Sequence, residues 1–149
     1  MNVKDGERST ERGLVSLVTQ LSKALHRRST DELLGMRLKA YMALGHLRDH
    51  PGTTQQELET GLLLDANTVV LILNELETAQ FVVRRRDPQD RRRHIVELTA
   101  AGRRALDRAD RAREGLEEGI LAPLSAEERK TLRRLIERVL DGMLQESRA

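Results

Sequence analysis

The sequence of 149 residues contains no cysteine, and Tyr41 and Phe81 are its only aromatic residues. Without cysteine the chain has no disulfide framework, no thiolate nucleophile and no cysteine-ligated zinc site. Proteins that read single-stranded nucleic acid stack bases on aromatic side chains, so this composition argues against that class. No apolar run approaches the roughly 20 residues that a membrane-spanning helix needs, and the polar start lacks the apolar core of a signal peptide. We therefore expect a cytoplasmic protein.

Charge is distributed unevenly along a chain whose formal net charge is only +2. Between Asp49 and Val83 there is no lysine or arginine, while five carboxylates occur there. The next ten residues, 84–93, contain six arginines against two aspartates, which is a local charge of +4. Such a patch attracts phosphate groups.

Apolar spacing and capping residues predict a mainly helical chain. The i, i+3, i+4 recurrence of apolar residues predicts helices over residues 10–26 and 37–48. In the second helix Leu38, Tyr41 and Met42 are expected to face inward, with Leu44 and Leu47 as further candidates. Four more helices are expected to begin at the capping residues Thr54, Asp65, Thr99 and Ser125. Thr54 and Ser125 are each followed three residues later by a glutamate, which is the spacing of a capping box. A chain of this length and composition fits one compact domain.

The helix that follows Asp65 has two distinct faces. Val69, Ile72, Leu73 and Leu76 recur at helical spacing and are expected in the core. A projection at about 100° per residue places the opposite, solvent or ligand face at four other positions: Asn67, Leu71, Asn74 and Thr78.

An arginine-rich hairpin is predicted after that helix. The runs 81–83 and 95–98 favour strands, and Asp87-Pro88 suits the first two positions of a tight turn between them. Six arginines are expected to project from this loop. A helix-turn-helix followed by a basic hairpin is the order of elements in winged-helix DNA readers, so the predicted fold class is mainly α with a small β-hairpin wing.

The wing sequence Asp87-Pro88-Gln89-Asp90-Arg91-Arg92, with Thr99-Ala100-Ala101-Gly102 and the stretch 124–129, resembles the multiple antibiotic resistance regulator (MarR) family. The resemblance implies one domain over residues 1–149, with a winged helix-turn-helix at 36–98 and a helical dimerisation region at 10–33 and 99–147. It also implies a homodimer that binds a palindromic operator. The residues expected to form the dimer interface are Leu14, Leu17, Leu21, Leu132, Leu135, Ile136, Val139 and Leu140.

The predicted DNA-binding residues come from the two helices of the helix-turn-helix and from the wing: Thr54, Gln55, Asn67, Thr68, Leu71, Asn74, Arg85, Arg86, Arg92 and Arg93. Arg92 aligns with the family's wing arginine, and Asp90 is expected to orient its arginine neighbours. Thr54 is equally explained as a helix cap. The chain departs from the family at Val70 and Leu71, where relatives offer a hydroxyl and often arginine, and at Gln80, where they have glycine. Asparagine pairs with adenine, so we expect an A·T-biased half-site.

A small anionic or phenolic effector is a further implication of the resemblance. Arg37, Tyr41 and His46 are the candidate pocket residues, although packing and surface charge explain them equally well. The four histidines are interpreted as scattered surface or packed residues, so no metal is assigned, and no cofactor is expected. The chain contains no Gly-rich phosphate loop, activated nucleophile or paired carboxylates on an apolar wall, so an enzyme is not expected.

Two functions remain open from the sequence. The first is a homodimeric transcriptional repressor that reads double-stranded DNA. The alternative is a degenerate family member whose acidic, cation-free recognition helix no longer reads DNA and holds a protein partner through Val70 and Leu71, with only nonspecific affinity for DNA.

Overall fold

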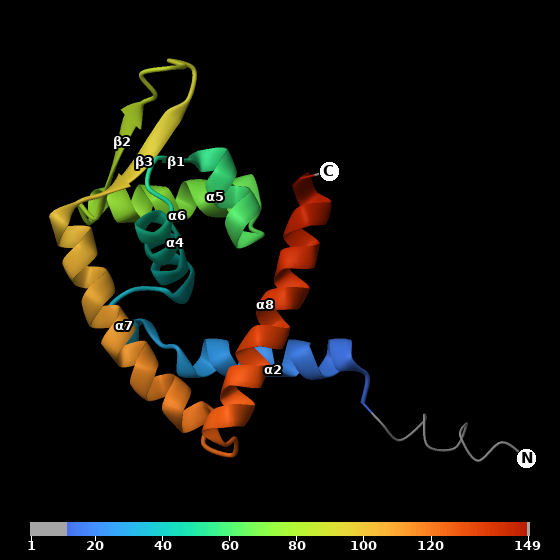
Figure 1. Cartoon of the computed structure of the whole chain (residues 1–149). Coiled ribbons are helices and arrows are strands. Elements are labelled where there is room, and N and C mark those ends of the chain that lie inside the picture. Colours follow the sequence, from blue (N-terminus) through green and yellow to red (C-terminus); the bar gives the residue numbers. More distant parts are fainter. Residues whose placement is uncertain (1–11, 149) are drawn as a thin grey trace, which may run out of the picture.

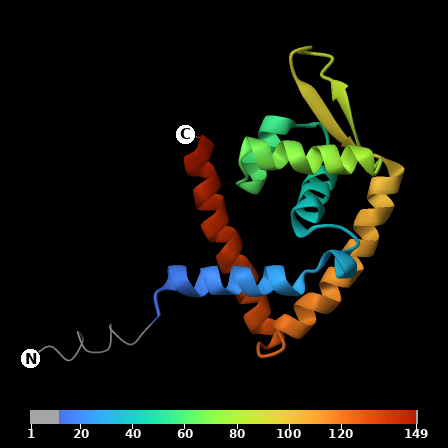
Figure 2. The ribbon, with the colours of Figure 1, turned by 180° about the vertical axis from the view of Figure 1, so that it is seen from behind.

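The computed structural model describes residues 12–148 and is mainly helical with one small sheet, as predicted (Figure 1). In chain order the elements are α2 (Leu14–Arg28), α3 (Asp31–Leu34), α4 (Leu38–Asp49), β1 (Thr53–Thr54), α5 (Gln55–Leu62), α6 (Ala66–Thr78), β2 (Val82–Arg86), β3 (His94–Leu98), α7 (Ala100–Ile120) and α8 (Ala126–Arg148). Helices α4 to α6 and the sheet form one body. Helix α7 leads away from that body to α8, which crosses α2 (Figure 2). None of the described helices is long and apolar enough to span a membrane.

The predicted helix starts are confirmed by their caps. Thr54 Oγ1 accepts a hydrogen bond from the backbone N–H of Glu57 (3.2 Å), and Glu57 Oε2 accepts one from the backbone N–H of Thr54 (3.1 Å). Ser125 forms the same reciprocal pair with Glu128. The first helix begins at Leu14, and residues 10 and 11 of its predicted start lie outside the described residues.

Two elements were not predicted, because each is too short to show a period. Helix α3 has four residues, and β1 has two residues that pair antiparallel with β3 through Thr53 and Val96. The sheet order is therefore β1-β3-β2, and α5 begins directly after β1.

The core lies between α4, α5, α6, α7 and the sheet. All four residues predicted for the inner face of α6 are buried, and all four of the opposite face are exposed. The prediction that Met42 faces inward is wrong, because its side chain is 40% exposed. Leu44 and Leu47 are buried as predicted. The inward stripe of α4 follows i, i+3, i+4, i+7 and includes two alanines in place of Met42: Ala40, Ala43, Leu44 and Leu47.

The wing differs from the predicted hairpin in where its strands and turn lie. Strand β2 runs through Arg86, opposite His94, so three arginines lie in the strand and not in the loop. The tight turn is not at Asp87-Pro88. It is closed by the backbone N–H of Arg93, which donates to the carbonyl of Asp90 (3.0 Å), while the Asp87 carboxylate accepts from the backbone N–H of Gln89. Asp87 still continues the ladder, because its N–H donates to the Arg93 carbonyl.

Two backbone features shape the connection from α6 to the wing: a left-handed residue at the end of α6 and a close contact between the start of α7 and Phe81. Gln80 has φ +62°, and the N–H groups of Gln80 and Phe81 donate to the carbonyls of Glu77 and Leu76, which is the Schellman pattern of a helix end. At the wing's base, a Cβ on Gly102 would lie 2.1 Å from the Phe81 carbonyl oxygen, so glycine is required there for α7 to pack.

Gln80→Gly should stabilise the protein by about 1 kcal/mol, because a left-handed backbone costs an L-residue with a Cβ roughly that much. Thermal unfolding monitored by circular dichroism measures the change. Ala79→Gly is the matched control, since Ala79 has an ordinary right-handed backbone (φ −76°) and glycine there should lower Tm. A fall in Tm for both variants would show that Gln80 is not strained.

Candidate nucleic-acid interface

Helix α6 presents a row of uncharged side chains to solvent. Asn67, Leu71 and Asn74 are exposed on this face, and Leu71 is 61% exposed. Thr68, at the first turn, is half-buried, and its backbone N–H donates to the Asp65 carboxylate (2.7 Å). That hydrogen bond lowers the pKa of Asp65. The wing projects from the same body, at the end of α6 (Figure 1). The face is therefore a polar, accessible surface of the size and kind that enters a DNA groove.

Most carboxylates of this region have a partner within the fold, and two of them are paired with arginines. The Arg37 guanidinium contacts Glu75 through two nitrogens. Its Nε donates to Oε2 (3.1 Å), and its Nη2 lies 2.5 Å from Oε1. Arg84 contacts Glu77, with Nε 2.5 Å from Oε1. Glu57 and Asp65 are engaged at helix starts. Of the five carboxylates between residues 49 and 83, four therefore have structural partners.

The six wing arginines divide into two groups. Arg84 turns back toward α6, Arg85 pairs with Glu97, and Arg93 lies 3.7 Å from Asp90. The expectation that all six project from the loop is therefore wrong. Within residues 12–148, the three that form no intramolecular ion pair are Arg86, Arg91 and Arg92.

Asp90 contacts both neighbours that it was expected to orient. One carboxylate oxygen accepts from the backbone N–H of Arg92 (3.1 Å), and the other lies near the Arg93 guanidinium. The Arg92 side chain is thus left exposed next to a carboxylate that holds the backbone of the turn.

The start of α5 offers less than predicted. Thr54 is buried, and its hydroxyl is engaged by Glu57, so its observed role is that of a cap. Gln55 is half-buried and is the residue of this pair whose side chain reaches solvent.

A hydrogen-bonded cluster joins the winged body to α7. The Tyr41 hydroxyl donates to Asp110 Oδ1, and Arg48 Nη1 donates to Oδ2, both at 2.6 Å. Burial, together with the bond to Asp110, raises the pKa of Tyr41 to about 12. Burial alone would raise the pKa of Asp110, but the bonds from Tyr41 and Arg48 outweigh it and lower that pKa. The carboxylate therefore stays ionised and fixes α7 against α4.

The three candidate pocket residues do not share a cavity. Arg37 lines a cavity of about 340 Å³ together with Glu75, whereas Tyr41 is committed to Asp110. His46 packs against Gly61 and stacks on His50, with ring centroids 4.2 Å apart.

The view of scattered histidines is therefore wrong for His46 and His50, which lie one helical turn apart. Burial lowers the pKa of His46. The part of the chain that the structure describes contains no group of three or more side chains that could hold a metal ion.

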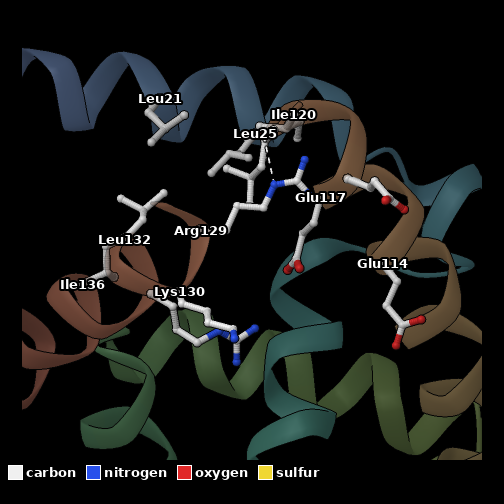
Figure 3. A pocket seen from close by; sticks show the side chains of 12 residues that line it. Leu21, Leu25, Glu114, Glu117, Ile120, Arg129, Lys130, Leu132 and Ile136 are labelled. Atoms are coloured by element: carbon white, nitrogen blue, oxygen red, sulfur yellow. Dashed lines mark hydrogen bonds between the residues drawn. The ribbon is translucent and has the colours of Figure 1, made fainter. Parts of the chain in front are cut away.

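A second, larger crevice of about 560 Å³ lies between α2, the end of α7 and α8 (Figure 3). Leu21 and Leu25 of α2 face Leu132 and Ile136 of α8 across it. Arg129 crosses one end, where its Nε donates to the Leu121 carbonyl (3.1 Å). The helical region far from the wing thus has an open, mostly apolar interior.

Sequence reasoning missed the partners of the arginines. Arg85 and Glu97 lie on neighbouring strands two register positions apart, so a predicted hairpin register would have found them. The contacts of Arg37 with Glu75 and of Arg84 with Glu77 depend on how α4 and β2 pack beside α6, and no spacing in the chain signals them.

Comparison with known proteins agrees with this geometry. A model of the MarR family matches residues 34–93. A relative from Thauera aromatica, described as a transcriptional regulatory protein for the hcr operon, is 30% identical over 128 residues, or 86% of this chain and 74% of the relative. The HTH-type transcriptional repressor NicR of Pseudomonas putida is 33% identical over 102 residues, 68% of this chain and 65% of that protein.

Solved structures show the same fold over nearly the whole chain. The crystal structure of MarR aligns with a TM-score of 0.82 at 25% identity, covering 93% of this chain and 95% of that one. The PcaV regulator from Streptomyces coelicolor, solved with its natural ligand, aligns with a TM-score of 0.74 at 27% identity, covering 89% and 97%. The relatives share the order of helix-turn-helix, wing and long closing helices described above, and the chain therefore belongs to the MarR family of winged helix-turn-helix, DNA-binding transcriptional regulators.

Proposed function

We propose that the protein represses transcription by binding a palindromic operator as a homodimer. The observation that carries this proposal is the exposed polar face of α6 beside a wing with three unpaired arginines. A helix of this kind fits the major groove, and a cationic loop beside it fits the phosphates and the adjacent minor groove. The relative NicR is named a repressor, which supports the sign of regulation.

Each part of the interface has a distinct task in this proposal. Arg92 enters the minor groove, where a narrow A·T tract concentrates negative potential. Arg86 contacts the phosphate backbone together with Arg85 and Arg93. The contacts of Arg85 and Arg93 with DNA require their ion pairs with Glu97 and Asp90 to loosen. Asn67 and Leu71 reach base edges, an amide toward adenine and an apolar side chain toward thymine methyl groups.

The homodimer is supported by two helices whose apolar faces are left largely uncovered within one chain. No residue of α2 is buried, and Leu14, Val15 and Val18 are each more than half exposed. On α8, the apolar residues Leu135, Ile136, Val139 and Leu140 are all exposed. Apolar faces of this length are stable in water only when covered, and a second copy supplies the same faces in return. The crevice of Figure 3 opens among these helices, where a partner's helix would complete the packing.

The alternative of a protein-interaction module is weakened on one of its two grounds. It took the recognition helix as acidic, but Arg37 and Arg84 pair with Glu75 and Glu77. The two carboxylates within α6 are therefore compensated, and three arginines of the nearby wing have no ion-pair partner within residues 12–148. The other ground of this alternative remains, because Leu71 is 61% exposed.

Control by a small anionic or phenolic ligand is part of the proposal, supported by the relative PcaV, which was solved with its natural ligand. In this chain the Arg37 guanidinium lines a cavity, where a carboxylate would compete with Glu75 for it. Aromatic carboxylates such as benzoate should then raise Tm and weaken DNA binding, because a ligand acts by favouring one conformation. Unchanged DNA affinity across such a series would remove ligand control by this class.

Arg92→Ala should weaken binding to every DNA sequence and reduce the slope of log affinity against log salt by about 1 for each wing. Fluorescence anisotropy on one duplex at several salt concentrations measures both quantities. Lys130→Ala is the matched control, because it removes one exposed cation at the start of α8, far from the wing (Figure 1). Its slope should equal that of the wild type. Equal slopes for wild type and Arg92→Ala would exclude a phosphate or groove contact by Arg92.

Val139→Asp should abolish dimerisation, because it places a charge in the centre of the apolar face of α8. Val139 is 65% exposed in one chain, so the substitution should leave a single subunit's own packing intact. Light scattering gives the mass, and circular dichroism reports the helix content. Arg134→Asp, on the opposite face of α8, should remain dimeric. A dimeric Val139→Asp protein would contradict this interface.

A further inference from the structure

We infer that Arg84 fixes the orientation of the Asn74 side-chain amide, with its NH₂ group outward, so that α6 selects guanine at one position of each half-site. This inference rests on the proposed function, since it requires that α6 reads base edges. It assigns to Arg84 a role that the other five wing arginines do not share: Arg84 positions a specificity-determining residue of the recognition helix.

The geometry of the contact determines which way the Asn74 amide points. Arg84 Nη2 donates to Asn74 Oδ1 at 3.2 Å, while Arg84 Nε lies 2.5 Å from Glu77 Oε1. A guanidinium carries only N–H donors, so the amide atom that faces it must be the oxygen. The Asn74 NH₂ group therefore points away from Arg84.

Two features keep this arrangement in place. Arg84 belongs to a paired strand, opposite Val96, and its side chain is only 27% exposed. Glu77 and Asn74 lie one turn apart on α6, so the guanidinium holds two points of the same helix. Asn67, by contrast, makes no side-chain hydrogen bond within residues 12–148, and its amide is free to adopt either sense.

The fixed amide changes which base it fits. A two-pronged contact with adenine needs the asparagine oxygen to accept from the N6 amine while the nitrogen donates to N7. Next to Arg84 one lone pair of the oxygen is already engaged, and an adenine amine that approached the other would also meet the positive guanidinium. Guanine presents two acceptors in the major groove, N7 and O6, which match an outward NH₂ group beside a positive charge. The A·T bias expected of free asparagines therefore applies to Asn67 and not to Asn74.

Selection from a randomised DNA duplex pool by the full-length protein tests this inference. Wild type should enrich a motif with guanine at one position of each half-site. Asn74→Ala should lose about 10-fold discrimination at that position alone. Asn67→Ala, the matched control on the same helix face, should alter a different position.

Two further variants separate a positioning role from a merely structural one. Arg84→Met releases the Asn74 oxygen and should shift the position from guanine toward adenine. Asn74→Asp keeps a partner for Arg84, so it protects the fold, but it presents only acceptors and should favour the cytosine amine. Circular dichroism confirms folding of both variants. If Arg84 only stabilised the fold, both variants would change Tm and leave the preferred base unchanged.

The outcomes distinguish failure of this inference from failure of the proposed function. Adenine at the position lost in Asn74→Ala would overturn the inference and leave the DNA reader intact. So would a motif that neither Asn74→Asp nor Arg84→Met changes. A wild-type pool with no enriched motif, despite salt-sensitive binding, would overturn sequence reading by α6 and with it the proposed function.

Discussion

The pairing of arginines from outside α6 with the carboxylates on it is the interaction on which the rest of the interface depends. Without Arg37 and Arg84, uncompensated charge on Glu75 and Glu77 would face the phosphates of DNA at close range and oppose binding. With them, both carboxylates within α6 are compensated, and the wing keeps three arginines without an ion-pair partner among residues 12–148. Arg84 also ties the first wing strand to the helix, so the two reading elements are expected to move as one unit.

A second constraint comes from the long helices that leave this unit. Asp110 on α7 holds Tyr41 and Arg48 of α4 at 2.6 Å each, which gives the winged body a defined direction relative to the helical region. In the proposed homodimer, a second copy would cover the apolar faces of α2 and α8. The two features together would then set the distance between the two recognition helices, and a ligand that changed the packing at either place would change that distance.

The sequence was sufficient for features that depend on local chemistry. The capping box at Thr54, the cap at Asp65 and both faces of α6 follow from short-range spacing, and all are observed. It was insufficient where the outcome depends on tertiary contacts. The inward stripe of α4 includes alanines where Met42 was expected, because α6 packs closely against it. The arginine partners and the separation of Arg37 from Tyr41 likewise depend on which elements become neighbours in space.

The most direct test of a sequence-reading DNA regulator is the affinity of the wild-type protein for DNA from upstream of its own gene, compared with scrambled DNA of the same composition. Fluorescence anisotropy at several salt concentrations measures both. The structure predicts that binding to either DNA weakens steeply as salt rises. It also predicts that the affinity for a true operator exceeds the affinity for scrambled DNA by at least about 10³-fold. If that DNA and a selected pool both yield only weak binding, equal to scrambled DNA, the wing's charge alone acts and α6 reads no sequence.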